Sequence, residues 1–569
     1  MSVPMNTPLY GRRGVERREA LTQPLSRKLA SVKRLAAGWP GSGAGIARGM
    51  GTAHWPPQGL VYGVDPSRFQ DSTGDGIGDL AGVTGRLDHV AALGADWLWL
   101  LPIYPSLRRD NGYDIDDHEH IDPRFGTAGD FAALVEGCHR RGIRLMLDLV
   151  IHHTSERHRW FQAARRDRKS RAGDYYIWAD EPIDSPDDRP VFPGEEDSVW
   201  TFDDEAEAWY HHQFYGFQPD LNVANEDVFE EIVRIATSWL RRGVDGFRID
   251  AAMPAVQPKP TEGTGVDPGR FYDRLRSRLA EVRDDVVLVA EADAAPAELA
   301  VLVDHHRIDA VLDFTLNNSI FLGLARGQAA PLHAALEGLD RSVPASARLN
   351  FVRNVDELDL DQLADDERDE VLEEFGGSRA ALLYGRGLRR GWAPMMGDAR
   401  RFRMTLSMLL ALPGVPLMMY GQELGIGDDL SVEGRDACRP VMQWSAARGG
   451  GFTRADNAPL ILPAQRDGPF DFHHVNARAQ ATEPDSPLAL TRRLTALRGE
   501  LGLAARPVRR HVLPGAPSVL ALSAGGFLTL HNLGREPAEV FEAYGAKPLL
   551  AERWNGHRLG PYGFAWLGR

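Results

Sequence analysis

The sequence is poor in cysteine, with only Cys138 and Cys438 among 569 residues. Two cysteines do not make a disulfide framework, so the composition favours a reducing compartment and we expect a cytoplasmic protein. No long apolar run follows the basic pairs Arg12-Arg13 and Arg17-Arg18 near the N-terminus. The sequence therefore predicts neither a signal peptide nor a membrane anchor, and residues 1–55 are expected to form a poorly ordered basic extension.

Positively charged side chains are also fewer than negatively charged ones, which gives a formal net charge of -15. This balance argues against a nucleic-acid partner. The hydrophobic fraction of 43% and the charged fraction of 25% are ordinary for a globular protein, whose 569 residues predict more than one domain. We expect a small-molecule partner and no nucleic-acid or membrane partner. The oligomeric state stays open, with a homo-oligomer among the alternatives.

Eight short apolar segments recur along the chain, most of them separated by a segment with helical periodicity, such as 80–93, 130–141, 228–242 and 271–283. Strands that are apolar throughout are typical of a parallel sheet, because both of its faces are covered. Repeated strand–helix units predict an α/β fold, and eight of them predict a closed (β/α)8 TIM barrel. The expected strands are 60–64, 95–105, 144–150, 243–250, 286–291, 309–314, 348–354 and 414–420.

Two stretches depart from this alternation. Residues 154–222 are polar and only partly periodic, which predicts a small inserted domain after the third strand. Residues 491–569 carry short alternating runs, which predict a C-terminal antiparallel β domain. The barrel would then comprise residues 56–153 and 223–490.

Carboxylates gather at the carboxyl ends of the expected strands, where barrels of this type have their active sites. Asp148, Asp250 and Glu291 lie at three of these ends, and Asp356 and Glu357 follow a fourth strand. Any one of them could be a structural ion pair or a helix cap. Several at one barrel mouth are harder to explain by stability, because like charges held together cost energy.

Arg248 lies two residues before Asp250, so both side chains share one face of a strand. A neighbouring cation keeps a carboxylate ionised, which suits Asp250 to act as a nucleophile. Glu291 ends an apolar strand and would stay protonated as an acid. Asp356 would hold sugar hydroxyls and raise the pKa of Glu291 by repulsion. This pattern predicts glycoside cleavage by a carboxylate pair.

The motifs around these carboxylates resemble those of the alpha-amylase superfamily of retaining glycoside hydrolases and transglycosylases. The matching segments are 148–153, 218–222, 246–250, 290–292 and 353–356. The resemblance runs from about Val61 to the C-terminus and implies a barrel, an inserted domain after strand three and a C-terminal β domain. It implies that Asp250 is the nucleophile, Glu291 the acid/base and Asp356 the transition-state stabiliser.

The same resemblance implies a glucose subsite. Its substrate-binding candidates are Tyr113, Asp114, His153, Arg248, Arg353 and Arg439.

Within the superfamily, three stretches are most similar to the trehalose synthase branch. They are 353–358 with 366–369 downstream, 442–444 after Arg435 and Arg439, and 475–480. This similarity implies a transferase or isomerase that acts on maltose and trehalose through a covalent glycosyl-enzyme. Two alternatives stay open. One is an alpha-glucosidase that uses water as the acceptor, and the other is a homologue that binds sugar without turning it over.

The loop Asp71–Asp79 resembles a structural calcium site of this branch, because oxygen-bearing side chains alternate with glycines. The alternative is an Asp- and Gly-rich turn without an ion. The expected Ca²⁺ ligands are Asp71, Thr73, Asp75, Ile77 and Asp79.

Three residues depart from the family pattern. Val355 stands where the family carries a histidine, which removes a hydrogen-bond donor worth roughly 10²–10³ in rate. His152 and Asp293 each replace a usual asparagine. His152 puts in doubt a second calcium site that would bridge to the inserted domain. Val355 leaves the glucose subsite either reshaped for another sugar or weaker.

Overall fold

The computed structural model describes residues 55–185, 189–455, 458–543 and 545–568. The predicted N-terminal extension, apart from Trp55, lies outside these residues. Within them, no helix combines the length and the apolar character that a membrane crossing requires.

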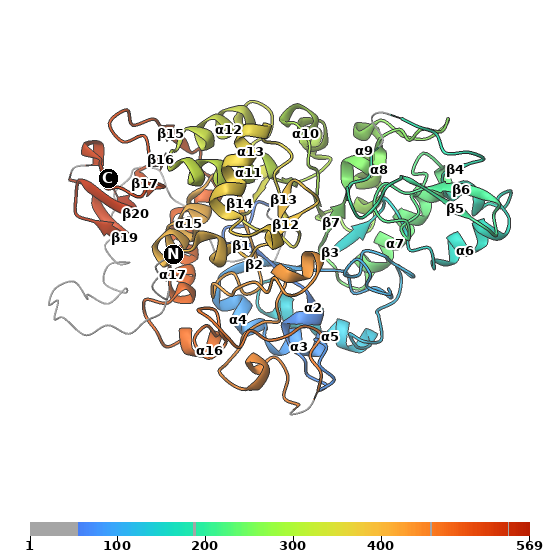
Figure 1. Ribbon diagram of the computed structural model, residues 1–569, viewed down its shortest axis with the longest axis horizontal. Coiled ribbons are helices and arrows are strands. Elements are labelled where there is room, and N and C mark those ends of the chain that lie inside the picture. Colours follow the sequence, from blue (N-terminus) through green and yellow to red (C-terminus); the bar gives the residue numbers. More distant parts are fainter. Residues whose placement is uncertain (1–54, 186–188, 456–457, 544, 569) are drawn as a thin grey trace.

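Eight parallel strands close into a barrel at the centre of the molecule (Figure 1). Neighbours in the barrel follow one another in the chain, and the last strand pairs with the first. All eight expected strands are present, so the predicted (β/α)8 fold is confirmed. The strands are β1 (Leu60–Val64), β2 (Ala95–Leu100), β3 (Arg144–Val150), β7 (Gly246–Asp250), β8 (Val287–Ala290), β9 (Ala310–Leu312), β10 (Arg348–Asn350) and β14 (Val415–Met419).

Apolar side chains fill the inside of the barrel, among them Trp97, Val289 and Leu417, so the barrel is a packed core and not a channel. Polar residues replace them toward the carboxyl ends of the strands. Asp148 on β3 lies directly beside Arg248 on β7, and Val150 lies beside Asp250. Strand register therefore brings the first charged groups of the site together.

Helices surround the barrel, and their caps agree with the sequence. For α5, Thr127 and Asp130 form a reciprocal capping box. The segment 80–93, expected as one helical unit, is two helices, because the backbone at Arg86 (φ -113°, ψ 4°) leaves the helical region. The main covering helices are α3 (Leu80–Gly85), α4 (Leu87–Ala92), α5 (Ala128–Arg140), α7 (Glu226–Arg241), α9 (Pro268–Ala280), α10 (Pro296–Val303), α11 (Phe314–Arg326), α12 (Ala330–Asp340), α15 (Ala399–Ala411) and α17 (Pro487–Leu501).

A separate three-stranded antiparallel sheet follows β3, at the right of Figure 1. It consists of β4 (Trp178–Ala179), β5 (Trp200–Asp203) and β6 (Ala208–His211), accompanied by α6 (Arg159–Arg166). Ile177, Val199 and Trp200 form a small apolar core of its own. We call residues 154–222 the insert.

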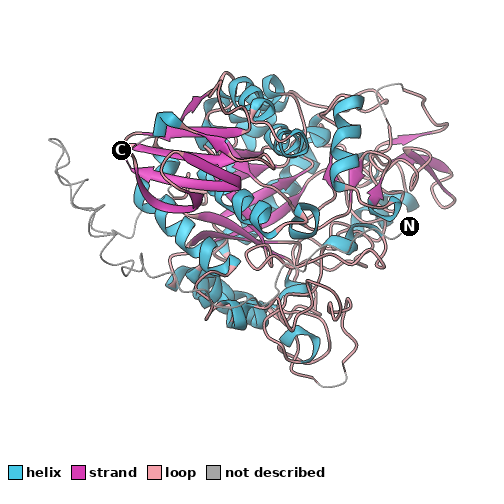
Figure 2. Ribbon diagram, turned by 60° about the vertical axis from the view of Figure 1, so that its left-hand side comes forward, coloured by secondary structure: helices cyan, strands magenta, loops and turns pink. Residues whose placement is uncertain are grey.

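The C-terminal sheet lies at the opposite end of the molecule and is seen well in Figure 2. It packs on α15, where Trp566 Nε1 donates a hydrogen bond to Ser407 Oγ at 2.8 Å. The predicted C-terminal antiparallel domain is confirmed. Its strands are β15 (Arg509–His511), β16 (Val519–Ala524), β17 (Phe527–Asn532), β18 (Ala538–Glu539), β19 (Lys547–Trp554) and β20 (Arg558–Gly568).

The boundary placed between residues 490 and 491 falls inside α17. The buried Arg498 of this helix donates hydrogen bonds to the carbonyls of Leu410 and Leu412, at 2.7 and 3.2 Å. Alpha17 is thus attached to the barrel, and the C-terminal sheet begins after it.

A long excursion separates β10 from β14. It contains α13 (Asp365–Phe375) and a small antiparallel sheet of β11 (Leu358–Asp359), β12 (Leu382–Leu383) and β13 (Gly387–Leu388). Arg386, next to β13, donates to the carbonyl of Val191 in the insert at 3.1 Å. The excursion and the insert therefore meet above the carboxyl ends of the barrel strands.

Candidate active site

Arg248 is the centre of the site. Its Nη1 lies 2.6 Å from Asp148 Oδ1 and 2.6 Å from Asp250 Oδ1, and its Nη2 lies 2.6 Å from Glu291 Oε1. The guanidinium is a rigid planar fork, so these contacts fix three carboxylates relative to one another. The structure thus brings the predicted nucleophile and the predicted acid side by side, from the ends of β7 and β8.

The residue after Asp250 helps to orient Glu291. Ala251 has φ 45° and ψ 46°, the left-handed region that non-glycine residues rarely adopt. This turn directs its N–H toward Glu291 Oε2, at 3.3 Å. Strained backbone of this kind is concentrated at functional sites, where the surrounding structure holds it in place.

Burial has the largest effect on the pKa values of Asp250 and Glu291. It raises the pKa of Glu291 to about 7, with the charges of Asp250 and Asp356 adding to the effect, and it raises the pKa of Asp250 to about 6. Arg248 opposes both shifts. The expectation that Arg248 keeps Asp250 ionised needs correction, because burial, together with the negative charges of Asp148, Asp110 and Asp356, outweighs the guanidinium. Asp250 is ionised only above about pH 6, while Glu291 keeps its proton up to about pH 7.

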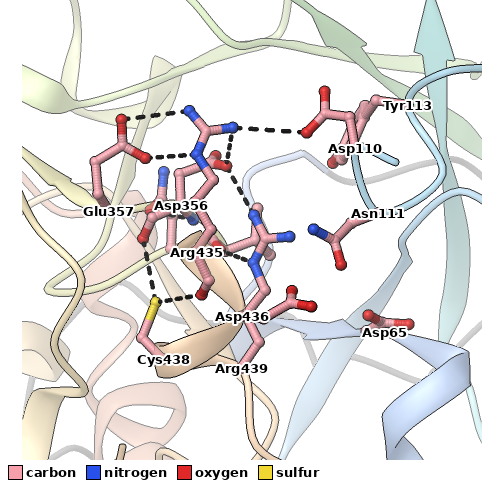
Figure 3. Close-up of polar contacts among 12 residues, drawn as sticks. Asp65, Asp110, Asn111, Tyr113, Asp356, Glu357, Arg435, Asp436, Cys438 and Arg439 are labelled. Carbon is pink, nitrogen blue, oxygen red and sulfur yellow. Dashed lines mark hydrogen bonds and ion pairs between the residues drawn. The ribbon is translucent and has the colours of Figure 1, made fainter. Parts of the chain in front are cut away.

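Asp356 lies across the site, held by two arginines from the loop after β14 (Figure 3). Its Oδ1 is 3.1 Å from Arg435 Nη1 and 2.9 Å from Arg439 Nη2. Although burial opposes it, the charges of Arg435 and Arg439 lower the pKa of Asp356. Asp356 is therefore the carboxyl group of the site with a lowered pKa, and its charge raises the pKa of Glu291 as expected.

A cavity of about 620 Å³ opens over these groups. Asp250, Glu291 and Asp356 all line it, together with Tyr113, His153 and Arg248 among the predicted substrate-binding residues. The insert forms an aromatic wall of the cavity with Phe192 and Phe214. A volume of this size fits a small sugar, since ligand pockets measure roughly 300–1,000 Å³.

Asp114 does not line this cavity. Its carboxylate is fully buried under the loop and accepts hydrogen bonds from Ser106 Oγ at 2.8 Å and from the N–H groups of Arg109 and Asp110, both at 3.2 Å. Burial raises its pKa. The prediction that Asp114 touches sugar is corrected, because its oxygens are used inside the loop.

Asp110, which the sequence reasoning missed, occupies the cavity wall instead. Its Oδ2 accepts from Gln218 Nε2 at 2.9 Å, and its Oδ1 lies 3.9 Å from Arg435 Nη1 (Figure 3). Two acidic residues stand close to Tyr113 in the sequence, and periodicity does not distinguish them. Only the path of the loop shows which one faces the cavity.

Arg353 and Arg439 lie behind Asp356 and do not line the cavity. Arg353 Nε donates to the carbonyl of Arg390 at 3.0 Å, and its Nη2 donates to the carbonyl of Asp356. Arg439 contacts the carboxylate of Asp356 and donates to the carbonyl of Val355. Both arginines position Asp356, which corrects their prediction as sugar-binding residues. Arg435 is the arginine of this loop that reaches the cavity.

The three departures from the family pattern have separate surroundings. Val355 belongs to the apolar cluster inside the barrel, which explains how its side chain is accommodated. Asp293 lies at the cavity wall and accepts a hydrogen bond from Gln362 Nε2. His152 is buried between the barrel and the insert, 3.3 Å from Asp220 Oδ1.

The predicted calcium loop is held by its own hydrogen bonds. Asp71 accepts from the N–H groups of Gly74 and Gly76 at 2.6 and 2.8 Å, and Asp79 accepts from Ser72 and from the N–H of Gly82, all at 2.7 Å. Within the described ranges, no group of three His, Cys, Asp or Glu side chains is placed to hold a metal ion. An Asp- and Gly-rich turn accounts for these contacts without an ion, so the calcium site stays a prediction.

Comparison with known proteins gives consistent matches. The sequence profile of the alpha-amylase catalytic domain matches residues 63–347 and 385–504, and the gap contains Asp356 and most of the excursion after β10. The chain is 36% identical to the "Trehalose synthase/amylase TreS" of Mycolicibacterium smegmatis, over 90% of this chain and 89% of that protein. It is 31% identical to an alpha-glucosidase of Pediococcus pentosaceus, over 76% of this chain and 83% of the relative.

Among solved structures, an alpha-amylase from H. orenii superposes with a TM-score of 0.70 at 27% identity. The match covers 90% of this chain and 99% of that one.

Proposed function

This chain belongs to the alpha-amylase family, and we propose that it is a retaining α-glucosyl transferase of the trehalose synthase type, which interconverts small α-glucosides such as maltose and trehalose. The single observation that supports the proposal most directly is the pair of contacts made by Arg248. Its guanidinium contacts both Asp250 and Glu291 at 2.6 Å, on the floor of a cavity of about 620 Å³. Adjacent carboxyl groups of unequal pKa are what double displacement at an anomeric carbon requires.

The first step forms a covalent intermediate. A carboxylate oxygen of Asp250 bonds to the anomeric carbon, Glu291 gives its proton to the glycosidic oxygen, and the bond between that oxygen and the anomeric carbon breaks. The charge of Asp356, opposite in sign to the developing oxocarbenium ion, stabilises this transition state. When maltose is the donor, glucose leaves and carries the proton.

The second step transfers the glucosyl unit. A hydroxyl of an acceptor attacks the anomeric carbon, Glu291 takes the hydroxyl proton, and the bond to Asp250 breaks. Attack by the anomeric hydroxyl of the released glucose yields trehalose, and attack by water yields free glucose. The meeting of the excursion with the insert above the site favours retention of that glucose, as does the contact of Tyr215 with Tyr384 at 3.1 Å between their hydroxyl oxygens.

An alpha-glucosidase is the second candidate, and the Pediococcus pentosaceus relative favours it. The two candidates share every catalytic group and differ in the acceptor. A sugar-binding homologue without turnover is the third, motivated by Val355. The intact pair of Asp250 and Glu291 opposes it, because burying such charges without a use costs stability.

We also propose a cytoplasmic location, which the low cysteine content supports, since Cys138 and Cys438 are both free thiols. A calcium ion at the loop Asp71–Asp79 is a further proposal, supported by the chemistry of its side chains. No step of the reaction above depends on it.

The products distinguish the candidates. The protein is incubated separately with maltose and trehalose, the anomeric proton signals are followed by NMR, and an Asp250→Ala variant is the control. Conversion of either disaccharide into the other supports the transferase, and free glucose alone supports the glucosidase. Identical, unchanged spectra for both proteins would refute an enzymatic function.

A further inference from the structure

A buried lysine lies where the insert meets the barrel. Lys259 follows α8 (Ala252–Val256), the short helix after Asp250, and its side chain is only 5% exposed. Its Nζ is 2.6 Å from Gln213 Oε1, 3.5 Å from Asp220 Oδ2 and 3.2 Å from His152 Nε2. An ammonium group taken out of water needs such partners, so these three contacts hold the buried Lys259 ammonium in a defined position.

The ammonium determines where His152 carries its proton. A lysine ammonium has three N–H donors and no lone pair, so it can only donate. Burial lowers the pKa of His152 well below its usual range, so the ring is neutral and holds one proton. His152 Nε2 faces Lys259 Nζ at 3.2 Å and Gln213 Oε1 at 3.3 Å, and that oxygen already accepts a hydrogen bond from the ammonium at 2.6 Å. The lone pair therefore lies on Nε2, toward the ammonium, and the proton lies on Nδ1, which faces Asp220 Oδ1 at 3.3 Å.

The position of the proton on His152 also determines the position of the proton on His153. His152 Nδ1 lies 3.3 Å from Asp220 Oδ1 and 3.2 Å from His153 Nδ1. Two N–H groups cannot face each other favourably, so His153 Nδ1 carries a lone pair. Burial lowers the pKa of His153 as well, so this ring is also neutral and its single proton lies on Nε2.

The protonated Nε2 of His153 lies at the catalytic cavity. His153 is one of the lining residues, and its Nε2 is buried without a well-formed hydrogen bond among the described residues; the backbone of Tyr113 lies close enough to the ring to act on its pKa. An unpaired buried donor is costly, and a ligand oxygen would satisfy it.

We propose that Lys259 is a positioning residue, which by donating to His152 fixes the proton of His153 on Nε2, where it is presented to an oxygen of the bound glucosyl unit. The inference rests on the proposed function and adds to it the group that sets this donor. It also gives the departure at His152 a role. An imidazole and an ammonium tie the insert to the barrel here, so this junction does not need a metal ion.

A double-mutant cycle on kcat/KM tests the inference, with maltose and trehalose as substrates. His153→Ala should lower kcat/KM by about 10²–10³, the effect of losing one well-placed donor. Lys259→Met removes the donor to His152 and should lower kcat/KM by about 10–100-fold, as loss of an orienting partner does. The double variant should fall no lower than His153→Ala, within about threefold, because Lys259 acts through His153. Lys169→Met, an exposed lysine of the insert, is the control and should match the wild type.

Additive losses in the double variant would overturn the inference, because they would mean that Lys259 acts on stability and not through His153. A kcat/KM of Lys259→Met equal to that of the wild type would also overturn it. Lys259→Gln is a separate test that holds even if Lys259→Met does not fold, since its amide still donates to His152 Nε2 but carries no charge. That variant should keep kcat/KM within about tenfold of the wild type, and a loss as large as that of His153→Ala would contradict the relay. Absence of turnover by the wild type itself would instead remove the proposed function.

Discussion

Replacing Arg248 by methionine removes the one cation that Asp148, Asp250 and Glu291 share. A neighbouring arginine lowers a carboxyl pKa by about 1–3 units, so its loss should raise the pKa of Asp250 from about 6 by a similar amount. At pH 7 between about half and nearly all of Asp250 would then be protonated and unable to attack. We expect kcat/KM at pH 7 to fall by about 2- to 90-fold from this cause alone, and the acid limb of its pH profile to move upward.

The same change makes stability depend more steeply on pH. A carboxyl group whose folded pKa lies above its unfolded value near 3.9 destabilises the fold as pH rises from the unfolded pKa to the folded one. For Asp250 this loss is complete near pH 6 in the wild type and continues to higher pH in the variant. Each unit of added pKa shift is worth about 1.4 kcal/mol per group. We therefore expect Arg248→Met to be about 1–4 kcal/mol more destabilising at pH 8 than at pH 5.

The assays are kcat/KM with maltose between pH 5 and 9 and urea unfolding at pH 5 and at pH 8. Arg341→Met is the control, since its ion pair with Glu337 is exposed on the surface and should contribute about 0–1 kcal/mol at most. An unmoved acid limb, or equal destabilisation at both pH values, would refute the claim that Arg248 lowers the pKa of the carboxyl groups that it contacts.

Three further predictions follow from the site. Asp356→Asn should lower kcat/KM by about 10²-fold or more and move the basic limb of the pH profile downward, because one of the charges that raise the pKa of Glu291 is lost; a basic limb that stays in place would contradict this. Asp110→Asn should reduce kcat/KM with little change in Tm, whereas Asp114→Asn should lower Tm, because Asp110 lines the cavity and Asp114 holds the loop; the reverse pattern would show that the two roles are exchanged. If the loop Asp71–Asp79 binds calcium, added Ca²⁺ should raise Tm, a chelator should reverse the rise and Asp75→Ala should abolish it; a wild-type Tm indifferent to both reagents would remove calcium from the account.

The fold was largely predictable because its signals are local and repeated. Each barrel strand is a short apolar run, and its burial on both faces makes the run visible without knowledge of its neighbours. The place of α17 was not visible, because it depends on tertiary contacts. Arg498, for example, attaches α17 to the barrel through carbonyls about 85 residues away in the chain.

Some residues of the candidate site could likewise be predicted from the sequence, and others could not. Asp250 and Glu291 follow apolar strands whose direction fixes where their side chains lie, so strand position alone indicated them. Asp110, Asp114 and the arginines around Asp356 lie on irregular loops, where periodicity carries no information about orientation. The shift of Asp250 to a pKa of about 6 depends on its burial and then on the carboxylates around it, which a single strand does not reveal.

Trapping the glycosyl-enzyme tests the central claim most directly. A Glu291→Gln variant, which lacks the acid/base for the second step, is incubated with α-glucosyl fluoride, whose fluoride leaves without a proton, and is analysed by peptide mass spectrometry. We expect the peptide containing Asp250 to gain the mass of one glucosyl unit, and the same peptide of an Asp250→Ala variant in this background to gain nothing. A glucosyl unit on another residue, or on none while fluoride is still released, would contradict this expectation.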